Sequence, residues 1–338
     1  MEKLNVNLLI KDTKEKLRGQ EVTRLAAIHA GVTVALGLVI TLLQFVLSKG
    51  IGNTGGLSGM GTRSILETMQ TVLQWANMLL MPFWNLGFLY AALQWARGNT
   101  PRKEDLLTGF RRIGPCIGLI LNRAFLVITV MIICINVSSI FYMMTPAAAK
   151  LTEMTASVGS DPEALYAFLE NMTDAQMLQM TEAMIPALVI CGVLSVIILI
   201  PLMYLFRFAE FVILNQWGAR GLSSMIISAT LLRRRCWQLF KLDLKLWWYY
   251  VLKLLCMVLF YGDLLLAAFG VTLPMGSDGM FLLTYVLYLA ALFAVETLFR
   301  PRVDTAYALF YEATLERGPV RKREPAKPQN MPWDDPNE

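Results

Sequence analysis

Residues 26–48 read AAIHAGVTVALGLVITLLQFVLS, a run of 23 residues without an aspartate, glutamate, lysine or arginine. An α-helix of about 20 apolar residues spans the ~30 Å hydrocarbon core of a bilayer. A strand does not fit this run, because its apolar residues are continuous rather than alternating. A helix also satisfies its backbone hydrogen bonds within the segment, as hydrocarbon requires. The stretch therefore predicts a transmembrane helix.

Five further stretches have the same character: Val72–Ala96, Ile113–Met144, Met184–Leu214, Leu246–Leu273 and Met280–Phe299. The composition agrees, with 56% hydrophobic residues, 16% charged residues and a mean hydropathy of +0.52. A soluble domain carries about 25% charged residues. The sequence predicts an all-α fold, a polytopic membrane helical bundle with six transmembrane helices.

The lysines and arginines separate into two groups when these six spans are placed on the sequence. Of the 30 in the chain, 24 fall in the N-terminal segment, the second loop, the fourth loop and the C-terminal segment. Only Lys49, Arg63 and Lys150 fall in the first, third and fifth loops. Cytoplasmic loops carry the excess of lysine and arginine, so both termini are predicted to be cytoplasmic.

The segments outside the spans comprise an outer loop, two inner helices and a tail. In the outer loop, residues 145–183, Ser160 and Thr173 stand at helix N-cap positions and predict two short helices. On the inner side, Leu4–Leu17 and Val303–Leu315 are basic and amphipathic, which is typical of helices lying in the headgroup layer against anionic lipid. Residues 1–317 form the expected membrane domain, and the proline-rich, charged residues 318–338 form an expected disordered cytoplasmic tail.

Two blocks of the sequence share a spacing. Gln94-Trp95 is followed after 17 residues by Arg111-Arg112, and Gln216-Trp217 is followed after the same interval by Arg233-Arg234. Each block lies between the inner end of one span and the start of the next. Although chance also produces two matching pairs, we take as a hypothesis that spans two–three and four–five are parallel repeats.

Three groups of residues carry a resemblance to a known family: Gly87-Phe88 with Arg97-Gly98 and Gly109-Phe110, residues 237–244 (WQLFKLDL), and residues 305–312 (TAYALFYE). On these motifs the chain resembles bacterial membrane proteins grouped as domain of unknown function 975, over most of its length up to Tyr311. Members have no agreed activity and are broadly similar to the membrane domain fused to some glycerophosphodiester phosphodiesterases. The resemblance implies the bacterial cytoplasmic membrane and a lipid-related or accessory role. The long third loop and the tail depart from the family pattern, and no catalytic residue is carried over.

Motifs for catalysis are missing from the sequence. His29 is the one histidine, so histidine zinc sites and Ser-His-Asp triads lack parts. Walker A, GxSxG and HExxH motifs do not occur. We predict no catalytic, cofactor-binding or metal site, no cofactor and no nucleic-acid partner, because topology and lipid charge explain the basic patches. His29 is interpreted as a satisfied packing residue rather than a proton carrier.

Ionisable residues inside the predicted spans form a candidate intramembrane polar site, which comprises Arg207, Glu210, Lys253 and Glu296. A charge at mid-bilayer costs about 2.5–3.5 kcal/mol on insertion scales, so such residues pair or face an aqueous cavity. One interpretation is a polar site between helices four, five and six that opens to the cytoplasm. The other, which we favour, is structural. In this structural interpretation, Glu210 pairs with Arg207 and Glu296 pairs with Arg300 along their own helices. The long side chain of Lys253 reaches the inner surface of the membrane.

Three classes of function follow from these observations. The first is a non-enzymatic scaffold, regulatory or accessory protein in contact with the bilayer and with anionic lipid headgroups at the inner face, acting through a membrane protein partner or self-association. The second is a transporter or lipid-handling permease that uses the polar site. The third, an enzyme acting on lipid headgroups, is weakest, because no pair of carboxylates stands with a nucleophile or a metal spacing.

Overall fold

The computed structural model describes residues 5–18, 21–53, 60–149, 173–216, 218–261 and 277–316. The secondary structure of these residues is helical, without a strand. The chain divides into two compact units, one of residues 1–117 with 208–338 and one of residues 118–207. The helix predicted near Ser160 and the predicted tail, residues 318–338, lie outside the described residues.

Four helical stretches in the described residues are long and apolar enough to cross a membrane: Val22–Leu47, Ser64–Ala96, Ile113–Met143 and Met177–Asn215. A fifth is added if Leu283–Leu298 and Arg300–Glu316, which meet at a 42° bend, form one span. The predicted span Leu246–Leu273 is described only as far as residue 261, where it contains the 14-residue helix α12, Trp247–Phe260. The helical membrane class is therefore supported, while the number six stays a prediction.

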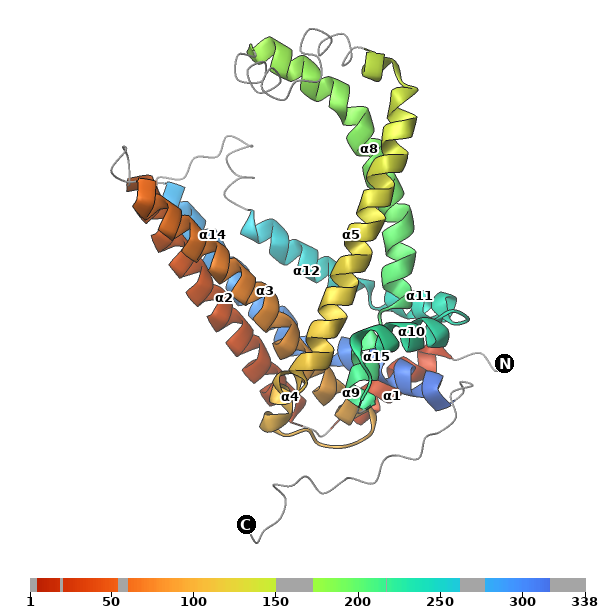
Figure 1. Cartoon of the computed structure of the whole chain (residues 1–338). Helices are drawn as coiled ribbons and strands as arrows, with labels where there is room; N and C mark the ends of the chain where they lie inside the picture. Colours follow the sequence, from red (N-terminus) through yellow and green to blue (C-terminus); the bar gives the residue numbers. More distant parts are fainter. Residues whose placement is uncertain are drawn as a thin grey trace. The chain divides into compact units, whose positions relative to one another are not determined.

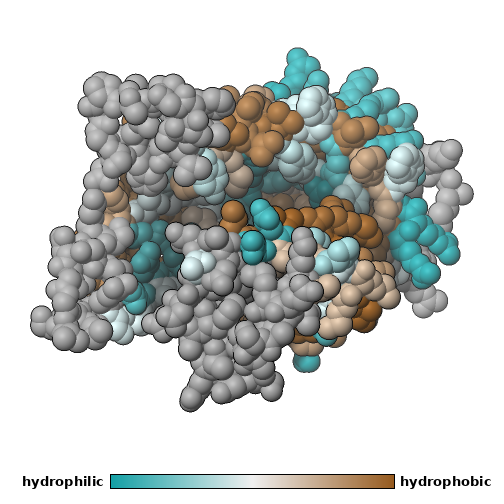
Figure 2. Space-filling view, turned by 90° about the horizontal axis from the view of Figure 1, so that it is seen from above, coloured by the Kyte–Doolittle hydropathy of each residue, from teal (hydrophilic) through white to brown (hydrophobic). Residues whose placement is uncertain are grey.

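The surface of these helices is apolar, as expected of a protein in contact with lipid. Large hydrophobic side chains such as Val46, Trp75, Phe125 and Leu188 are more than half exposed. Figure 2 shows hydrophobic side chains in brown over much of the described surface, while hydrophilic side chains gather at one side of the view.

The larger unit contains a group of adjacent long helices, in which α2 (Val22–Asn53) packs against α3 (Met60–Ala96) and α14 (Ser277–Leu298) (Figure 1). Helix α12 packs against α14. The core between α2 and α3 holds Leu25, Ala26, Trp84, Phe88 and Trp95, all of them buried. Most of the apolar surface of α3 that is removed from solvent therefore lies toward the end of the helix that includes Trp95.

Two glycines allow an unusually close approach of the chain to this end of α3. A Cβ atom added to Gly87 would lie 1.8 Å from the carbonyl oxygen of Leu106, which belongs to the 3₁₀ helix η2 (Lys103–Leu107). A Cβ atom added to Gly109, in the short helix α4 (Thr108–Arg111), would lie 1.9 Å from the carbonyl oxygen of Phe83. Only glycine fits where two backbones approach this closely.

A second group of helices lies at one end of the larger unit: α1 (Val6–Lys16), α9 (Ala209–Asn215), α10 (Gly221–Leu232), α11 (Cys236–Lys245) and α15 (Arg300–Glu316). Helix α15 contacts α1, α2, α3 and α14. Its buried residues are Pro301, Val303, Thr305, Ala306, Tyr307, Ala308, Phe310, Tyr311 and Thr314. The expectation that Val303–Leu315 lies on lipid does not match this packing, because protein covers the apolar side chains of this helix.

The smaller unit contains most of α5 (Ile113–Met143) and α8 (Asp174–Leu205). The Tyr142 hydroxyl donates to the carbonyl oxygen of Ala183 over 3.0 Å, and the Arg123 guanidinium donates to that of Phe206 over 3.1 Å. Helix α8 begins directly after Thr173, where the N-cap was predicted. It then continues to Leu205, so the second short helix predicted in the outer loop is instead the first turn of a long helix.

The predicted span Met184–Leu214 is not one continuous helix. Helix α8 ends at Leu205, residues 206–208 form a turn, and α9 begins at Ala209. The backbone N–H of Phe208 donates to the hydroxyl of Ser228 on α10 over 3.1 Å, which satisfies the freed donor at the break. Arg207 therefore stands in the turn and Glu210 in the first turn of α9, and their pairing stays a prediction.

The proposed repeat agrees with the structure in its turns and differs after them. Gly98 and Gly218 both adopt positive φ, 81° and 98°, just after the first helix of each block. After Arg112 the long helix α5 begins at once, whereas α11 stands between Arg234 and α12. Trp217 lies outside the described residues. A shared turn is therefore seen, and the repeat itself stays a hypothesis.

Candidate functional site

The candidate site is a buried cluster of charged side chains where α14 meets α15. Glu296, Arg300 and Asp304 follow one another at intervals of four residues, which places them along one side of helical backbone. Pro301 has no N–H to donate to the helix, and its ring clashes with the carbonyl group four residues earlier. These two effects explain the 42° bend at this point. The bend directs the three side chains into the interior instead of along a straight helix surface.

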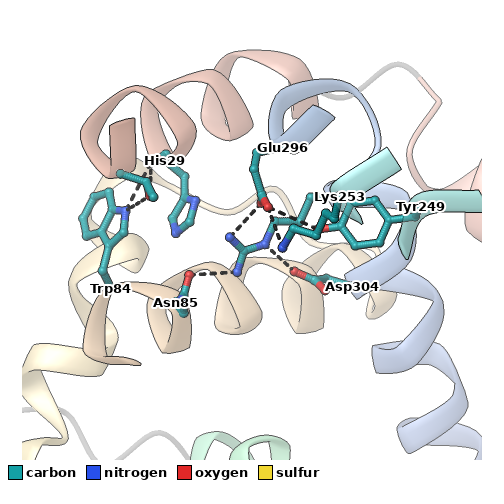
Figure 3. Close-up of polar contacts among 9 residues, drawn as sticks. His29, Trp84, Asn85, Tyr249, Lys253, Glu296 and Asp304 are labelled. Carbon is teal, nitrogen blue, oxygen red and sulfur yellow. Dashed lines mark hydrogen bonds and ion pairs between the residues drawn. The ribbon is translucent and has the colours of Figure 1, made fainter. Parts of the chain in front are cut away.

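Arg300 uses each of its three nitrogens in this cluster. Figure 3 shows the side chains of Asn85, Glu296 and Asp304, which accept these hydrogen bonds, around one place between the helices. The Nη1 atom of Arg300 donates to Glu296 and its Nε donates to Asp304, both over 3.0 Å. Its Nη2 donates to the side-chain oxygen of Asn85, on α3, again over 3.0 Å. The side chains of Arg300 and Glu296 are only 13% and 6% exposed. A planar guanidinium with five fixed donors suits such a junction of three acceptors.

Lys253, on α12, adds the second positive charge. Its Nζ lies 2.7 Å from the other carboxylate oxygen of Glu296 and 5.2 Å from the centre of the Tyr249 ring. The Tyr249 hydroxyl donates to the same oxygen over 3.4 Å. Two cations therefore face two carboxylates, and the cluster is neutral overall. Lys253 is its most exposed member, at 42%.

Aromatic rings lie against one side of the cluster. The guanidinium carbon of Arg300 lies 4.9 Å from the centre of the Phe88 ring, close enough for a cation–π contact. His29 is buried beside Phe88 and stacks on Trp84 with ring centres 5.2 Å apart. The expectation that His29 packs in the core holds. It is not satisfied, however, because its Nε2 atom has no hydrogen-bond partner among the described residues.

This arrangement can hold helices together through paired charges. Both carboxylates accept hydrogen bonds from cations, and breaking such a buried network by removing one partner costs about 3–5 kcal/mol. Among the described residues, no group of three or more His, Cys, Asp and Glu side chains is placed to hold a metal ion. The cluster ties α3, α12, α14 and α15 into one charged junction.

The structure brings together two of the four residues predicted to form a polar site. Lys253 and Glu296 form an ion pair, and Glu296 also pairs with Arg300 as expected. Arg207 lies in the smaller unit with its guanidinium carbon 5.7 Å from the centre of the Tyr204 ring. Glu210 lies in the first turn of α9, and the ion pairs of Lys253 and Glu296 within the described residues do not include it.

Three members of the cluster, Asp304, Asn85 and Tyr249, were not included in the predicted polar site. Asp304 carried a usable signal, because it continues the four-residue spacing of Glu296 and Arg300. Asn85 and Tyr249 carried none, since Asn85 is 215 residues from Arg300 and Tyr249 is 47 residues from Glu296. An asparagine or a tyrosine in an apolar span is common, and only the fold shows which one faces the arginine.

Helix α15 is joined to its surroundings by further polar contacts beyond the cluster. The Tyr307 hydroxyl contacts Asp243 on α11 and lies 2.7 Å from the Tyr250 hydroxyl. Glu312 pairs with Arg97 at the end of α3 over 2.6 Å. The Asn215 amide donates to the Tyr311 hydroxyl over 3.4 Å. Residues 305–312 therefore make many of the polar contacts that join α15 to the neighbouring helices.

A second arginine is held in the same part of the chain by a neutral partner. Arg112, in the turn between α4 and α5, is 8% exposed and donates to the carbonyl oxygen of Ile213 on α9. Burial lowers the pKa of Arg112 from its usual value, although an arginine stays charged in proteins. It links the η2–α4 segment to α9.

Comparisons with protein-family models, with curated proteins and with solved structures found no match to this chain. The resemblance to the domain of unknown function 975 proteins therefore stays a prediction.

Proposed function

We propose that this chain is a non-enzymatic scaffold, regulatory or accessory protein of the bacterial cytoplasmic membrane, with six spans and both termini in the cytoplasm. The observation that carries the proposal is the set of polar contacts that helix α15 makes with its neighbours. Its charged and hydroxyl side chains are used to bind α3, α9, α11, α12 and α14. The buried ionisable groups therefore hold together the helices at this end of the larger unit and are not left open to a substrate. These helices, α1, η2, α9, α10, α11 and α15, are called the inner assembly below.

Helix α11 supports contact between this inner assembly and anionic lipid. Its Leu239 and Leu242 are buried, whereas Trp237, Phe240 and Leu244 are exposed at 66%, 45% and 61%. Lys241 and Lys245 are exposed on the same helix. Exposed aromatic and aliphatic side chains beside lysines are typical of a helix that lies in the headgroup layer. We therefore assign to α11 the lipid contact that the sequence predicted for Val303–Leu315.

Site-specific photo-crosslinking in the native membrane tests the proposal. A photoreactive residue replaces Glu104 on η2 or Ser223 on α10, both exposed at the surface of the inner assembly. The control position is Leu254, which is 61% exposed on the apolar helix α12. We expect one recurring protein adduct, the same in replicate membranes and identified by mass spectrometry, from the first two positions and not from Leu254. Absence of any protein adduct at both inner positions would contradict a scaffold.

A transporter or lipid-handling permease is the second candidate, and one observation favours it. Lys253 is 42% exposed while its partner Glu296 is 6% exposed, so one member of the pair reaches the surface. If Lys253→Met abolishes a solute- or lipid-dependent phenotype of the host while the protein stays folded, and Leu254→Met does not, the permease replaces the scaffold.

A further inference from the structure

A hollow of about 400 Å³ lies between α1 and α15, and its lining is basic. The residues around it are Lys14, Leu17, Arg18 and Arg302. Pockets of ~300–1,000 Å³ hold small molecules, so this space is larger than a bare inorganic anion needs. Among the described residues that line it, three carry a positive charge and none carries a negative one.

The three cations come from separate parts of the chain. Lys14 lies in the last turn of α1, and Arg18 follows directly after Leu17, the C-cap of that helix. Arg302 comes from the beginning of α15, and contacts between α1 and α15 hold the two helices together. The fold therefore places three like charges around one hollow, where their combined field favours an anion.

These cations differ from the others of the inner assembly because they lack acidic partners. Arg97 pairs with Glu312, and Arg300 pairs with Glu296 and Asp304. Within the described parts of the chain, the side chains of Lys14, Arg18 and Arg302 make no ion pair or hydrogen bond. Their charges are available to a ligand.

We propose that this pocket binds a phosphate monoester group. Two guanidinium groups match the oxygens of a phosphate with paired hydrogen bonds, and a lysine adds a point charge. Leu17 supplies an apolar wall for the carbon chain next to the phosphate. The same chemistry is presented by a soluble phosphate ester and by an anionic lipid with a terminal phosphate. This inference does not depend on the scaffold function.

Binding to the full chain in mild detergent, measured by native mass spectrometry, tests the site and its source of phosphate. The probes are dioctanoyl phosphatidic acid, glycerol 3-phosphate and, as a zwitterionic reference, dioctanoyl phosphatidylcholine. We expect phosphatidic acid or glycerol 3-phosphate to bind more tightly than phosphatidylcholine. Tighter binding of the lipid identifies the membrane as the source, and equal binding of both phosphate probes identifies a soluble ester.

Two double variants with the same change in charge make the test specific. Arg18→Gln with Arg302→Gln removes cations from the pocket, and Arg111→Gln with Arg233→Gln removes exposed cations outside it. We expect the first to weaken binding of the phosphate probe by about tenfold or more and the second by less than about twofold. Equal losses in both, or no preference over phosphatidylcholine, would overturn the proposal. If the first variant does not fold, Arg302→Lys with Arg18→Lys keeps the charge and is expected to retain measurable binding.

Discussion

Arg300 and Arg302 stand two residues apart on α15, yet their surroundings are opposite. Arg300 is buried, with Glu296, Asp304 and Asn85 each accepting a hydrogen bond from it. Arg302 is exposed at the edge of a basic hollow. Two steps along an α-helix turn a side chain by about 200°, so the two residues point to nearly opposite sides. The identity of a residue and its place near a membrane therefore do not decide whether its charge is structural or available.

The difference also separates two consequences of mutation. Removing a buried partner leaves opposite charges uncompensated in a poorly solvated place, whereas removing an exposed cation leaves nothing stranded. The first kind of change is expected to reduce stability, and the second to reduce binding. The following predictions test that separation.

The largest effect is expected from Arg300→Met. The substitution keeps much of the side-chain volume but removes the cationic partner of Asp304 and one of the two cationic partners of Glu296, which should lower the free energy of unfolding by about 3–5 kcal/mol. Arg302→Met is the matched control and should leave stability nearly unchanged. Denaturation by SDS in mixed micelles, with folded yield from size-exclusion chromatography, measures both. Equal losses would remove the contrast between the two arginines.

The next effect concerns the backbone that positions Asn85. Gly87→Ala would place a methyl group 1.8 Å from the carbonyl oxygen of Leu106, so η2 must move away from α3. We expect a loss of about 2–3 kcal/mol, typical of overpacking. Gly114→Ala meets no atom within 4 Å and lies in helix α5, so it should be neutral or slightly stabilising. If the Gly87→Ala protein has the same free energy of unfolding as the wild type, α3 and η2 do not approach each other as closely as described.

A double-mutant cycle sharpens the position of Lys253 between the two kinds of charge. Glu296→Gln should be more destabilising than Lys253→Met, because Glu296 serves two cations and Lys253 is partly exposed. The coupling energy between the two changes should be about 1 kcal/mol. Thermal unfolding of the wild type, both single variants and the double variant provides it. A coupling energy near zero would mean that the ion pair is not formed.

The smallest effect is expected where α15 contacts α11 and α12. Tyr307→Phe removes the hydroxyl that contacts Asp243 and Tyr250 and should cost about 1 kcal/mol. Tyr261→Phe, at an exposed position after α12, is the matched control and should change little. The shift in the thermal unfolding midpoint of each variant checks this. If both variants unfold at the wild-type temperature, the Tyr307 contacts do not contribute to stability.

The parts of the fold that follow from short-range pattern could be predicted. The apolar runs located the long helices, and the four-residue spacing of Glu296 and Arg300 predicted their ion pair. The amphipathic segment at residues 303–315 was recognised as a helix, but its environment was not. A helix with one apolar side has the same sequence pattern whether lipid or protein covers that side.

The break at residues 206–208 shows a second limit of prediction. An uninterrupted apolar run predicted one helix there, and no glycine or proline marks the break. The backbone N–H of Phe208, which is freed at this break, donates a hydrogen bond to the hydroxyl of Ser228 on α10. A local pattern cannot include such a partner, so the turn that contains Arg207 was not predicted.

The sequence by itself determined that much of this chain is apolar helix, and it predicted that the cations collect in alternate loops, because helix length and charge bias are properties of consecutive residues. Only the tertiary structure decided which charges are neutralised. Arg300 meets Asn85 across 215 residues, and Lys14 and Arg18 meet Arg302 across more than 280 residues. Pairing depends on which side of a helix is buried against which neighbour, and that is a property of the packed molecule.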